Sequence, residues 1–213
     1  MKGKAGRRGP FGSRRALVRA SFFLAASLTL SAASCGIFDT RDSEPPGNGG
    51  SEVPSRRPLN PADVLFNYVN AVKYFSQANY DETLAADFEF LPDDEDRAYF
   101  LSQGSDVFQD WDKSKEAAAV QRIFGDSDSL TVTFVEVSST PITDVVLLDL
   151  DYVFRRVIFR RGEEDSVASF RGLARVHMRE DQSGFWAIDK WTDFSSPGDD
   201  RTWGFLKGTV TSG

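Results

Sequence analysis

Five carboxylates lie within apolar stretches whose alternation is typical of strands: Glu89, Asp149, Asp151, Asp189 and Asp193. A carboxylate held in a dry pocket beside a proton donor can act as a general base. Alternation places Asp149 and Asp151 opposite the face that carries Leu150, so we expect both to face water. Asp189 and Asp193 share a face with Trp191 and are the candidates for catalysis. Solvation at a surface or an edge strand is the alternative interpretation of both.

Aromatic side chains are the second group that could form a site. The candidates to line a pocket are Trp111, Tyr152, Phe154, Trp186 and Trp191. An apolar pocket of this kind would bind a small apolar ligand. The alternative is that these rings fill the hydrophobic core, which aromatic residues commonly do.

Basic residues form a stripe around the single histidine. Arg171, Arg175, His177 and Arg179 alternate along one stretch and share the face opposite its apolar residues. One interpretation is a site for an anion or a lipid headgroup. The other is a solvated outer face of a sheet, with acidic cross-strand partners such as Asp149 and Asp151.

Composition excludes several classes of protein. One cysteine and one histidine exclude an intrachain disulfide, a multi-cysteine zinc or iron–sulfur site and a multi-histidine metal cluster. The sequence has no P-loop, no dinucleotide fingerprint and no G-x-S-x-G motif. The net charge of −7 argues against a nucleic-acid partner, which requires a basic face. We therefore expect neither a metal nor a cofactor.

The first 34 residues have the order of a bacterial signal peptide. A basic segment, which ends at Arg19, precedes the apolar run 20–30 and the small residues Ser31–Ser34. The apolar run is shorter than the roughly 20 residues that span a bilayer. An uncleaved N-terminal membrane anchor is the alternative.

Cys35 follows the small residues directly and is the only cysteine. The sequence Ala32-Ala33-Ser34-Cys35 resembles the lipobox of bacterial lipoproteins, although Ala32 stands where Leu is commonest. The resemblance implies that the Cys35 thiol carries a diacylglyceryl group, which anchors the chain in a membrane. The alternative is an ordinary signal-peptidase cleavage beside an incidental thiol.

The route and destination of export are less defined. The segment 13–19 is similar to the twin-arginine motif, with conservative replacements, and a general basic segment is the equal alternative. Gly36 after the cysteine resembles lipoproteins that are sorted to an outer membrane. We therefore expect a protein of the bacterial cell envelope that faces the periplasm or the cell exterior.

A tether and one domain follow the signal peptide. Residues 35–60 are rich in Gly, Pro, Ser and charge and lack an apolar period, so they are predicted to be a lipid-attached flexible tether. Residues 61–213 are predicted to form a single domain. The signal peptide holds seven basic and no acidic residues, so the remaining chain has a net charge of −14.

The apolar spacing predicts helices first and strands afterwards. Helices are expected from Asn60–Pro61, over about 80–86 with Asn79 as its cap, and over about 112–124. A short strand is expected at 87–91, and the stretch 97–111 is ambiguous. After Gly125 we expect long strands at 129–137, 144–161, 166–179 and 185–194 and no clear helix, with a bulge suspected at Arg156.

This order predicts an α+β fold in which three N-terminal helices pack in a strongly curved, cone-shaped antiparallel sheet. Asp87-Phe-Glu-Phe90, Trp111 and the C-terminal segment 185–193 resemble nuclear-transport-factor-2-like, or polyketide-cyclase-like, domains. That family contains both enzymes and binding domains, so the resemblance implies an architecture and a pocket and assigns no catalytic residue.

Two functions follow from these patterns. The first is a lipid-anchored envelope protein whose domain binds an envelope partner or a small apolar ligand without catalysis. The second is an isomerase- or hydratase-like enzyme that uses a pocket carboxylate in the cone.

Overall fold

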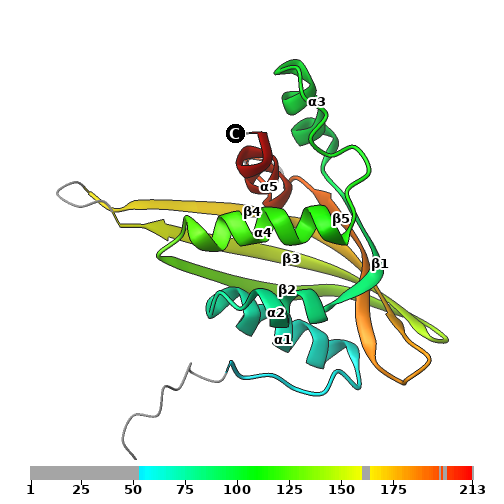
Figure 1. The fold of residues 1–213 in the computed structure, drawn as a ribbon. Helices are drawn as coiled ribbons and strands as arrows, with labels where there is room; N and C mark the ends of the chain where they lie inside the picture. The colour runs from blue at the N-terminus through cyan, green and yellow to red at the C-terminus, as the bar shows by residue number, and fades with distance from the viewer. Residues whose placement is uncertain (1–52, 160–163, 197, 199–200, 213) are drawn as a thin grey trace, which may run out of the picture. The chain divides into compact units, whose positions relative to one another are not determined.

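The computed structural model describes residues 53–159, 164–196, 198 and 201–212, and the predicted signal peptide and Cys35 lie outside them. Figure 1 shows the element order. The helices are α1 (Pro61–Lys73), α2 (Gln77–Glu82), α3 (Asp94–Ser102), α4 (Lys113–Gly125) and α5 (Trp203–Ser212). The strands are β1 (Leu84–Leu91), β2 (Ser129–Ile142), β3 (Val145–Ile158), β4 (Ser166–Glu180) and β5 (Trp186–Phe194).

The helices α1, α2 and α4 begin at polar caps. Asn60 caps α1 by accepting a hydrogen bond from the backbone N–H of Asp63 at 3.0 Å, as the sequence predicts. Asp112 caps α4 in the same way. Helix α2 begins and ends earlier than expected, because Ser76 rather than Asn79 is its cap and residues 84–86 belong to β1.

Two further helices differ from the sequence expectation. The ambiguous stretch 97–111 contains most of α3, whose cap is Asp93. The expectation of no helix after Gly125 was wrong, because α5 forms at the C-terminal end of the chain. Its apolar start, Trp203–Leu206, is followed by glycine and β-branched residues that individually disfavour a helix. Packing against the rest of the domain therefore determines that this segment is helical.

The five strands form one sheet in the order β1-β5-β4-β3-β2. The β2–β3, β3–β4 and β4–β5 pairs are antiparallel, as expected, whereas β1 joins β5 in parallel. The suspected bulge at Arg156 is absent from the described pairing, which is continuous there on both sides. The Arg156 guanidinium instead donates to Ser127 Oγ and the Asp126 carbonyl at the end of α4.

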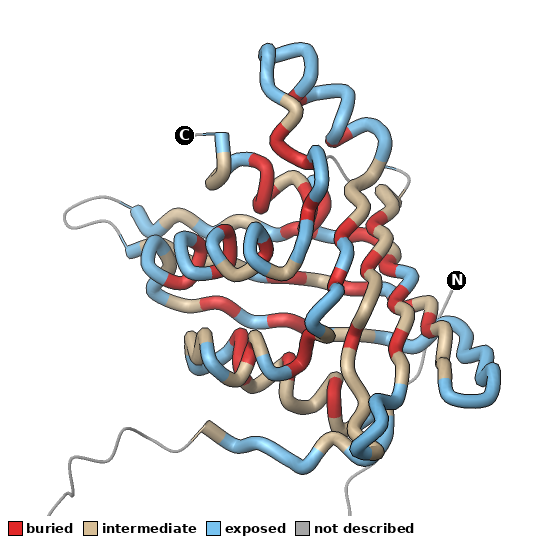
Figure 2. The backbone as a smooth tube through the Cα atoms, turned by 45° about the vertical axis from the view of Figure 1, so that its right-hand side comes forward, coloured by how far each residue is buried: buried red, intermediate tan, exposed pale blue. Residues whose placement is uncertain are grey.

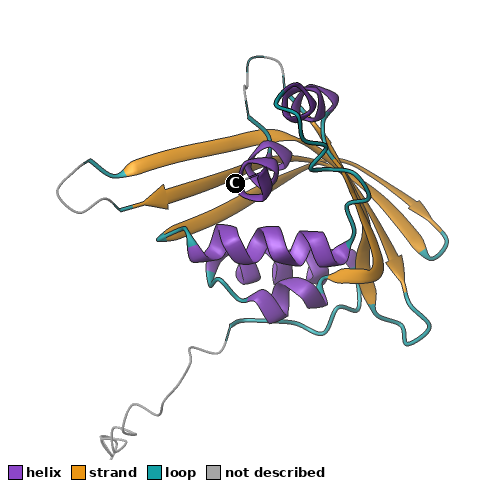
Figure 3. Cartoon of the chain, turned by 45° about the horizontal axis from the view of Figure 1, so that its top comes forward, coloured by secondary structure: helices purple, strands orange, loops and turns teal. Residues whose placement is uncertain are grey.

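One face of the sheet is buried by the helices. Figure 3 shows the strands bending around the helices, and Figure 2 shows buried and exposed positions alternating along them. In β3 the residues Leu148, Leu150, Tyr152 and Phe154 are buried, as alternation predicts. We call the space between this concave face and helices α1, α2, α4 and α5 the cone interior. No described helix has the length and apolar character needed to cross a membrane.

Candidate functional site

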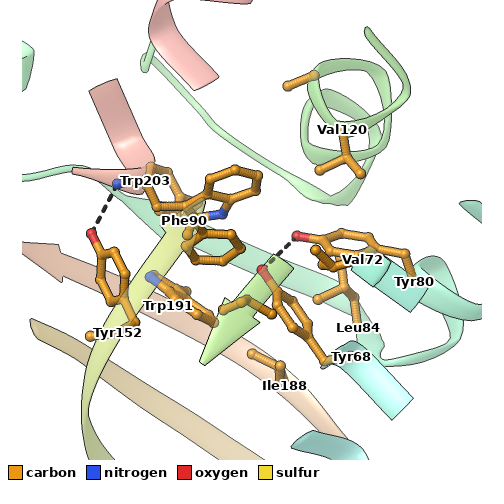
Figure 4. Packing of buried hydrophobic residues seen from close by; sticks show 14 of the residues in the cluster. Tyr68, Val72, Tyr80, Leu84, Phe90, Val120, Tyr152, Ile188, Trp191 and Trp203 are labelled. Carbon is orange, nitrogen blue, oxygen red and sulfur yellow. Dashed lines mark hydrogen bonds between the residues drawn. The ribbon is translucent and has the colours of Figure 1, made fainter. Parts of the chain in front are cut away.

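Four of the five aromatic candidates meet in the cone interior. Tyr152, Phe154 and Trp191 project from the concave face, and Trp111 lies in the loop before α4; all four are at most 2% exposed. Figure 4 shows Trp203 of α5 in the same cluster, and its ring stacks on Phe154 at 4.0 Å between centroids. Side chains of the chain itself thus occupy the space in which a ligand would contact these rings.

A buried carboxylate organises one side of the cone interior. Glu116 of α4 accepts hydrogen bonds from the Tyr80 hydroxyl at 2.5 Å and from Trp111 Nε1 at 2.8 Å. The Tyr80 hydroxyl is also 3.1 Å from that of Tyr68. Burial is the main cause that raises the pKa of both tyrosines, and the Glu116 charge adds to it. Both hydroxyls therefore remain protonated.

The partner of this carboxylate comes from α5. Lys207 Nζ lies 2.9 Å from Glu116 Oε1, and both side chains are 1% exposed. The same nitrogen lies 3.6 Å from the Phe90 ring centroid, in the geometry of a cation–π contact. Burial lowers the pKa of Lys207, and the Glu116 carboxylate opposes this effect. The ion pair thus joins α5 to α4 deep inside the domain.

A second carboxylate lies at the start of α5. Asp193 Oδ1 accepts from the Tyr152 hydroxyl at 2.5 Å, and Oδ2 accepts from the Gly204 backbone N–H at 2.8 Å. The backbone N–H of Trp203 donates to the Tyr152 hydroxyl at 2.9 Å. Gly172 lies opposite Tyr152, and a Cβ there would be 2.6 Å from that hydroxyl. Glycine at 172 therefore gives Tyr152 the room to reach Asp193.

Burial raises the pKa of Asp193 to about 6, despite hydrogen bonds from Tyr152 and Gly204 that favour the charged form. Asp96 of α3 behaves similarly, since burial raises its pKa to about 6 although it accepts a hydrogen bond from the Thr202 hydroxyl. Two carboxylates with raised pKa values therefore hold the N-terminal end of α5.

Asp189, the other catalytic candidate, lies apart from Asp193. Met178 pairs with Ile188 and His177 with Lys190, so Asp189 is the extra residue of a bulge. Ile188 and Trp191 are consequently both buried, although simple alternation would separate them. Asp189 instead lies on the outer face and contacts His177 Nδ1.

Three residues of the basic stripe, Arg175, His177 and Arg179, contact acidic side chains. Arg175 forms an ion pair with Asp149 at 2.8 Å, and Arg179 contacts Asp87. The Arg175 side chain remains 54% exposed, so this part of the sheet is a solvated outer face with cross-strand acidic partners.

Trp186, the fifth aromatic candidate, packs at the edge of the buried cluster. It is half-buried and borders a groove of about 580 Å³ between the start of β1 and the β4–β5 turn. The groove is lined by Arg57, Pro58, Glu82, Leu84, Ala85, Ala86, Arg179, Asp181, Phe185, Trp186 and Ala187. The Trp186 backbone N–H donates to the Pro58 carbonyl at 2.8 Å, which places the end of the predicted tether beside the groove.

The groove opens because β1 leaves its partner. Leu84 pairs with Ile188 and Glu89 with Lys190, so residues 85–88 have no register partner in β5. The guanidinium of Arg57 lies over the Phe185 ring at 4.7 Å. The lining combines apolar and aromatic side chains with four charged ones, Arg57, Glu82, Arg179 and Asp181, a combination that suits a small ligand.

Among the described residues, no three His, Cys, Asp or Glu side chains are grouped to hold a metal ion.

The buried pair Glu116 and Lys207 was not predicted from the sequence. In the sequence, each of the two is only a charged residue beside apolar ones. Lys207 lies within Trp203–Gly208, and Glu116 precedes Ala117–Val120. Exposed helix faces show the same signal, so it could not identify a buried pair.

Comparisons with solved structures show similarity of fold. A protein from Kribbella flavida aligns with a TM-score of 0.52 and 11% identity over 68% of this chain and 93% of its own. A conserved protein from Planctomyces limnophilus aligns with a TM-score of 0.50 and 14% identity over 62% and 89%. A Streptomyces avermitilis protein of the nuclear-transport-factor-2-like family aligns with a TM-score of 0.48 and 7% identity over 62% and 92%.

No family model matches the sequence, and no curated protein matches it. The α+β architecture with helices against a curved sheet agrees with the sequence prediction. At these identities the likeness concerns the fold alone.

Proposed function

We propose that the protein is an exported, lipid-anchored envelope protein whose domain binds a small apolar ligand without catalysing a reaction. The binding site in this proposal is the groove beside Trp186. An envelope protein partner is the alternative occupant.

The observation that carries this proposal is the contrast in accessibility between the cone interior and the groove. Trp203 and Lys207 of α5 are 0% and 1% exposed and pack among the rings of the cone interior. Trp186 remains half-buried at the edge of a groove of about 580 Å³. That volume lies within the roughly 300–1,000 Å³ typical of small-molecule sites.

The lipid anchor rests on Cys35 and the signal peptide before it. Metabolic labelling with a fatty acid in a bacterial host tests it, with Cys35→Ala as the variant. We expect label on the wild type and none on the variant, and equal labelling would contradict the anchor.

The groove is tested by titration with phenylnaphthylamine, a neutral apolar dye whose fluorescence rises on binding. We expect Trp186→Ala to weaken binding about tenfold, because a tryptophan that a ligand covers is commonly a strong contact residue. Tyr99→Ala is the matched control, since Tyr99 is an exposed aromatic that does not line the groove. Equal binding by wild type and Trp186→Ala would refute the groove, and binding of an envelope protein without the dye would favour the partner.

An isomerase- or hydratase-like enzyme is the second candidate, favoured by the Asp193–Tyr152 pair. Asp193 has a raised pKa beside a hydroxyl donor, which is the arrangement of a general base. The indole N–H groups of Trp191 and Trp203 are buried nearby without an acceptor among the described residues. The Asp193 carboxylate, however, already holds the Gly204 backbone N–H, so catalysis would require α5 to move.

Exchange of deuterium into the α-position of cyclohexenone tests this second candidate by NMR. An enzyme would show exchange that Asp193→Asn abolishes. Exchange at the rate of buffer alone in the wild type would favour the binding domain.

A further inference from the structure

The Lys207 ammonium is held in the way that a protein holds a cationic ligand. Glu116 supplies a carboxylate at 2.9 Å, and aromatic rings supply the surrounding surface. The nitrogen lies 3.6 Å from the ring centroid of Phe90, 5.3 Å from that of Trp203 and 5.9 Å from that of Trp191. A carboxylate with several aromatic faces is the combination that recognises an ammonium group.

The Glu116 carboxylate is oriented for this role by α2 and by the loop before α4. Tyr80 and Trp111 donate to its two oxygens at 2.5 and 2.8 Å, and so fix its orientation toward Lys207. The side chains of Phe90, Trp111 and Trp191 are at most 2% exposed, so water does not screen the attraction. A charge in this position must be paired, because an unpaired buried charge is costly.

Of the residues around the Lys207 ammonium named above, only Trp203 belongs to α5. The other residues come from α2, α4, β1, β5 and the loop before α4: the Glu116 carboxylate, its donors Tyr80 and Trp111, and the rings of Phe90 and Trp191. Together they form the site that surrounds the ammonium group of α5.

We propose that the cone interior is a binding site for small primary ammonium ions, and that Lys207 of the chain itself occupies it in this structure. Lys207 is then an internal ligand, and α5 and an external ammonium compound exclude each other at the Glu116 carboxylate. This inference does not depend on the lipid anchor or on the groove beside Trp186.

Removal of the internal ligand tests the proposal. In Lys207→Ala the missing atoms are three carbons and the ammonium nitrogen, which correspond to propylammonium. We expect propylammonium chloride to raise the Tm of this variant saturably, by about 3 °C or more. Propanol, the neutral analogue, and sodium chloride at equal ionic strength should not raise it. If the variant is unfolded alone, the same titration is followed by circular dichroism, and propylammonium is expected to restore the native signal.

Two proteins serve as matched controls. The wild type should not respond, because Lys207 fills the site. The double variant Glu116→Gln/Lys207→Ala keeps the space but lacks the carboxylate, and it should not distinguish propylammonium from propanol. No response of Lys207→Ala to propylammonium, an equal response to propanol, or an equal response of the double variant would overturn the proposal.

Discussion

Charged pairs of the same kind lie on the two sides of the central sheet in different surroundings. Inside, Lys207 and Glu116 meet at 2.9 Å with both side chains 1% exposed. Outside, Arg175 and Asp149 meet at 2.8 Å with side chains 54% and 23% exposed. The distances are nearly equal, so solvent exposure is the property that separates the pairs.

This difference shows where the structure depends on its charges. An exposed ion pair replaces contacts with water by a contact that water still screens, so it contributes little to the free energy of unfolding. A buried pair has lost its hydration, so each partner depends on the other. The inner pair and the carboxylates beneath α5 should therefore control whether the cone interior stays closed.

The largest expected effect is that of Glu116→Gln, which leaves the Lys207 ammonium buried without its counter-charge. We expect the free energy of unfolding to fall by about 3–5 kcal/mol, measured by urea denaturation. Glu89→Gln is the control, because it breaks the exposed contact with Lys190 and should cost at most about 1 kcal/mol. Equal losses in the two variants would contradict the difference between the faces.

The pH dependence of stability should identify Asp193. Its pKa in the folded protein, about 6, lies above the ordinary value of 3.8, so the native state retains a proton that the unfolded chain releases. The resulting stabilisation is complete below about pH 4 and is lost as the pH rises through 6, by up to about 3 kcal/mol. We expect unfolding measured between pH 4 and 7 to show this decline, and Asp193→Asn to reduce it to the part that Asp96, whose pKa is also raised to about 6, contributes. If stability declined with pH equally steeply in Asp193→Asn, another titrating group would be responsible for the decline.

A steric change on α5 should have a smaller effect. A Cβ added at Gly208 would lie 2.3 Å from Phe100 Cε2, so Gly208→Ala should separate α5 from α3 and lower stability by about 1–3 kcal/mol. Gly125→Ala is the matched helical control, because a Cβ there has open space, and it should be stabilising by up to about 1 kcal/mol. Thermal unfolding of both variants measures the contrast, and a stabilised Gly208→Ala would show that α5 is not tightly packed.

The smallest effect is expected on the outer face. A double-mutant cycle with Arg175→Ala and Asp149→Ala should give a coupling energy of about 0.2–1 kcal/mol that decreases with added salt. A coupling of several kcal/mol would mean that the outer stripe is a structural element comparable to the inner pair.

Much of the fold was predictable because it follows from periodicity. Alternation in β3 identified Tyr152 and Phe154 as residues of the apolar face, and both are buried. Alternation also placed Asp189 beside Asp193, which is wrong, because the bulge in β5 transfers Asp189 to the outer face. A bulge depends on pairing with another strand, so a single sequence does not reveal it.

The contents of the cone interior were not predictable for a related reason. Helix α5 has weak intrinsic helix propensity and is held by contacts with distant residues, such as Asp193 and Glu116. Its glycines argue against a helix locally, but Gly208 allows the close approach to Phe100 and Gly204 the close approach to Asp193. Such long-range contacts are properties of the folded chain rather than of a local pattern.

The central claim is that α5 closes the cone interior, so that a small apolar ligand binds in the groove beside Trp186. Backbone NMR spectra of the wild type with and without phenylnaphthylamine test this claim most directly. The account predicts shifted amide signals at Ala85, Ala86, Trp186 and Ala187, which line the groove, and unchanged signals at Phe154 and Trp191. Shifts confined to Phe154, Trp191 and the α5 residues would contradict it.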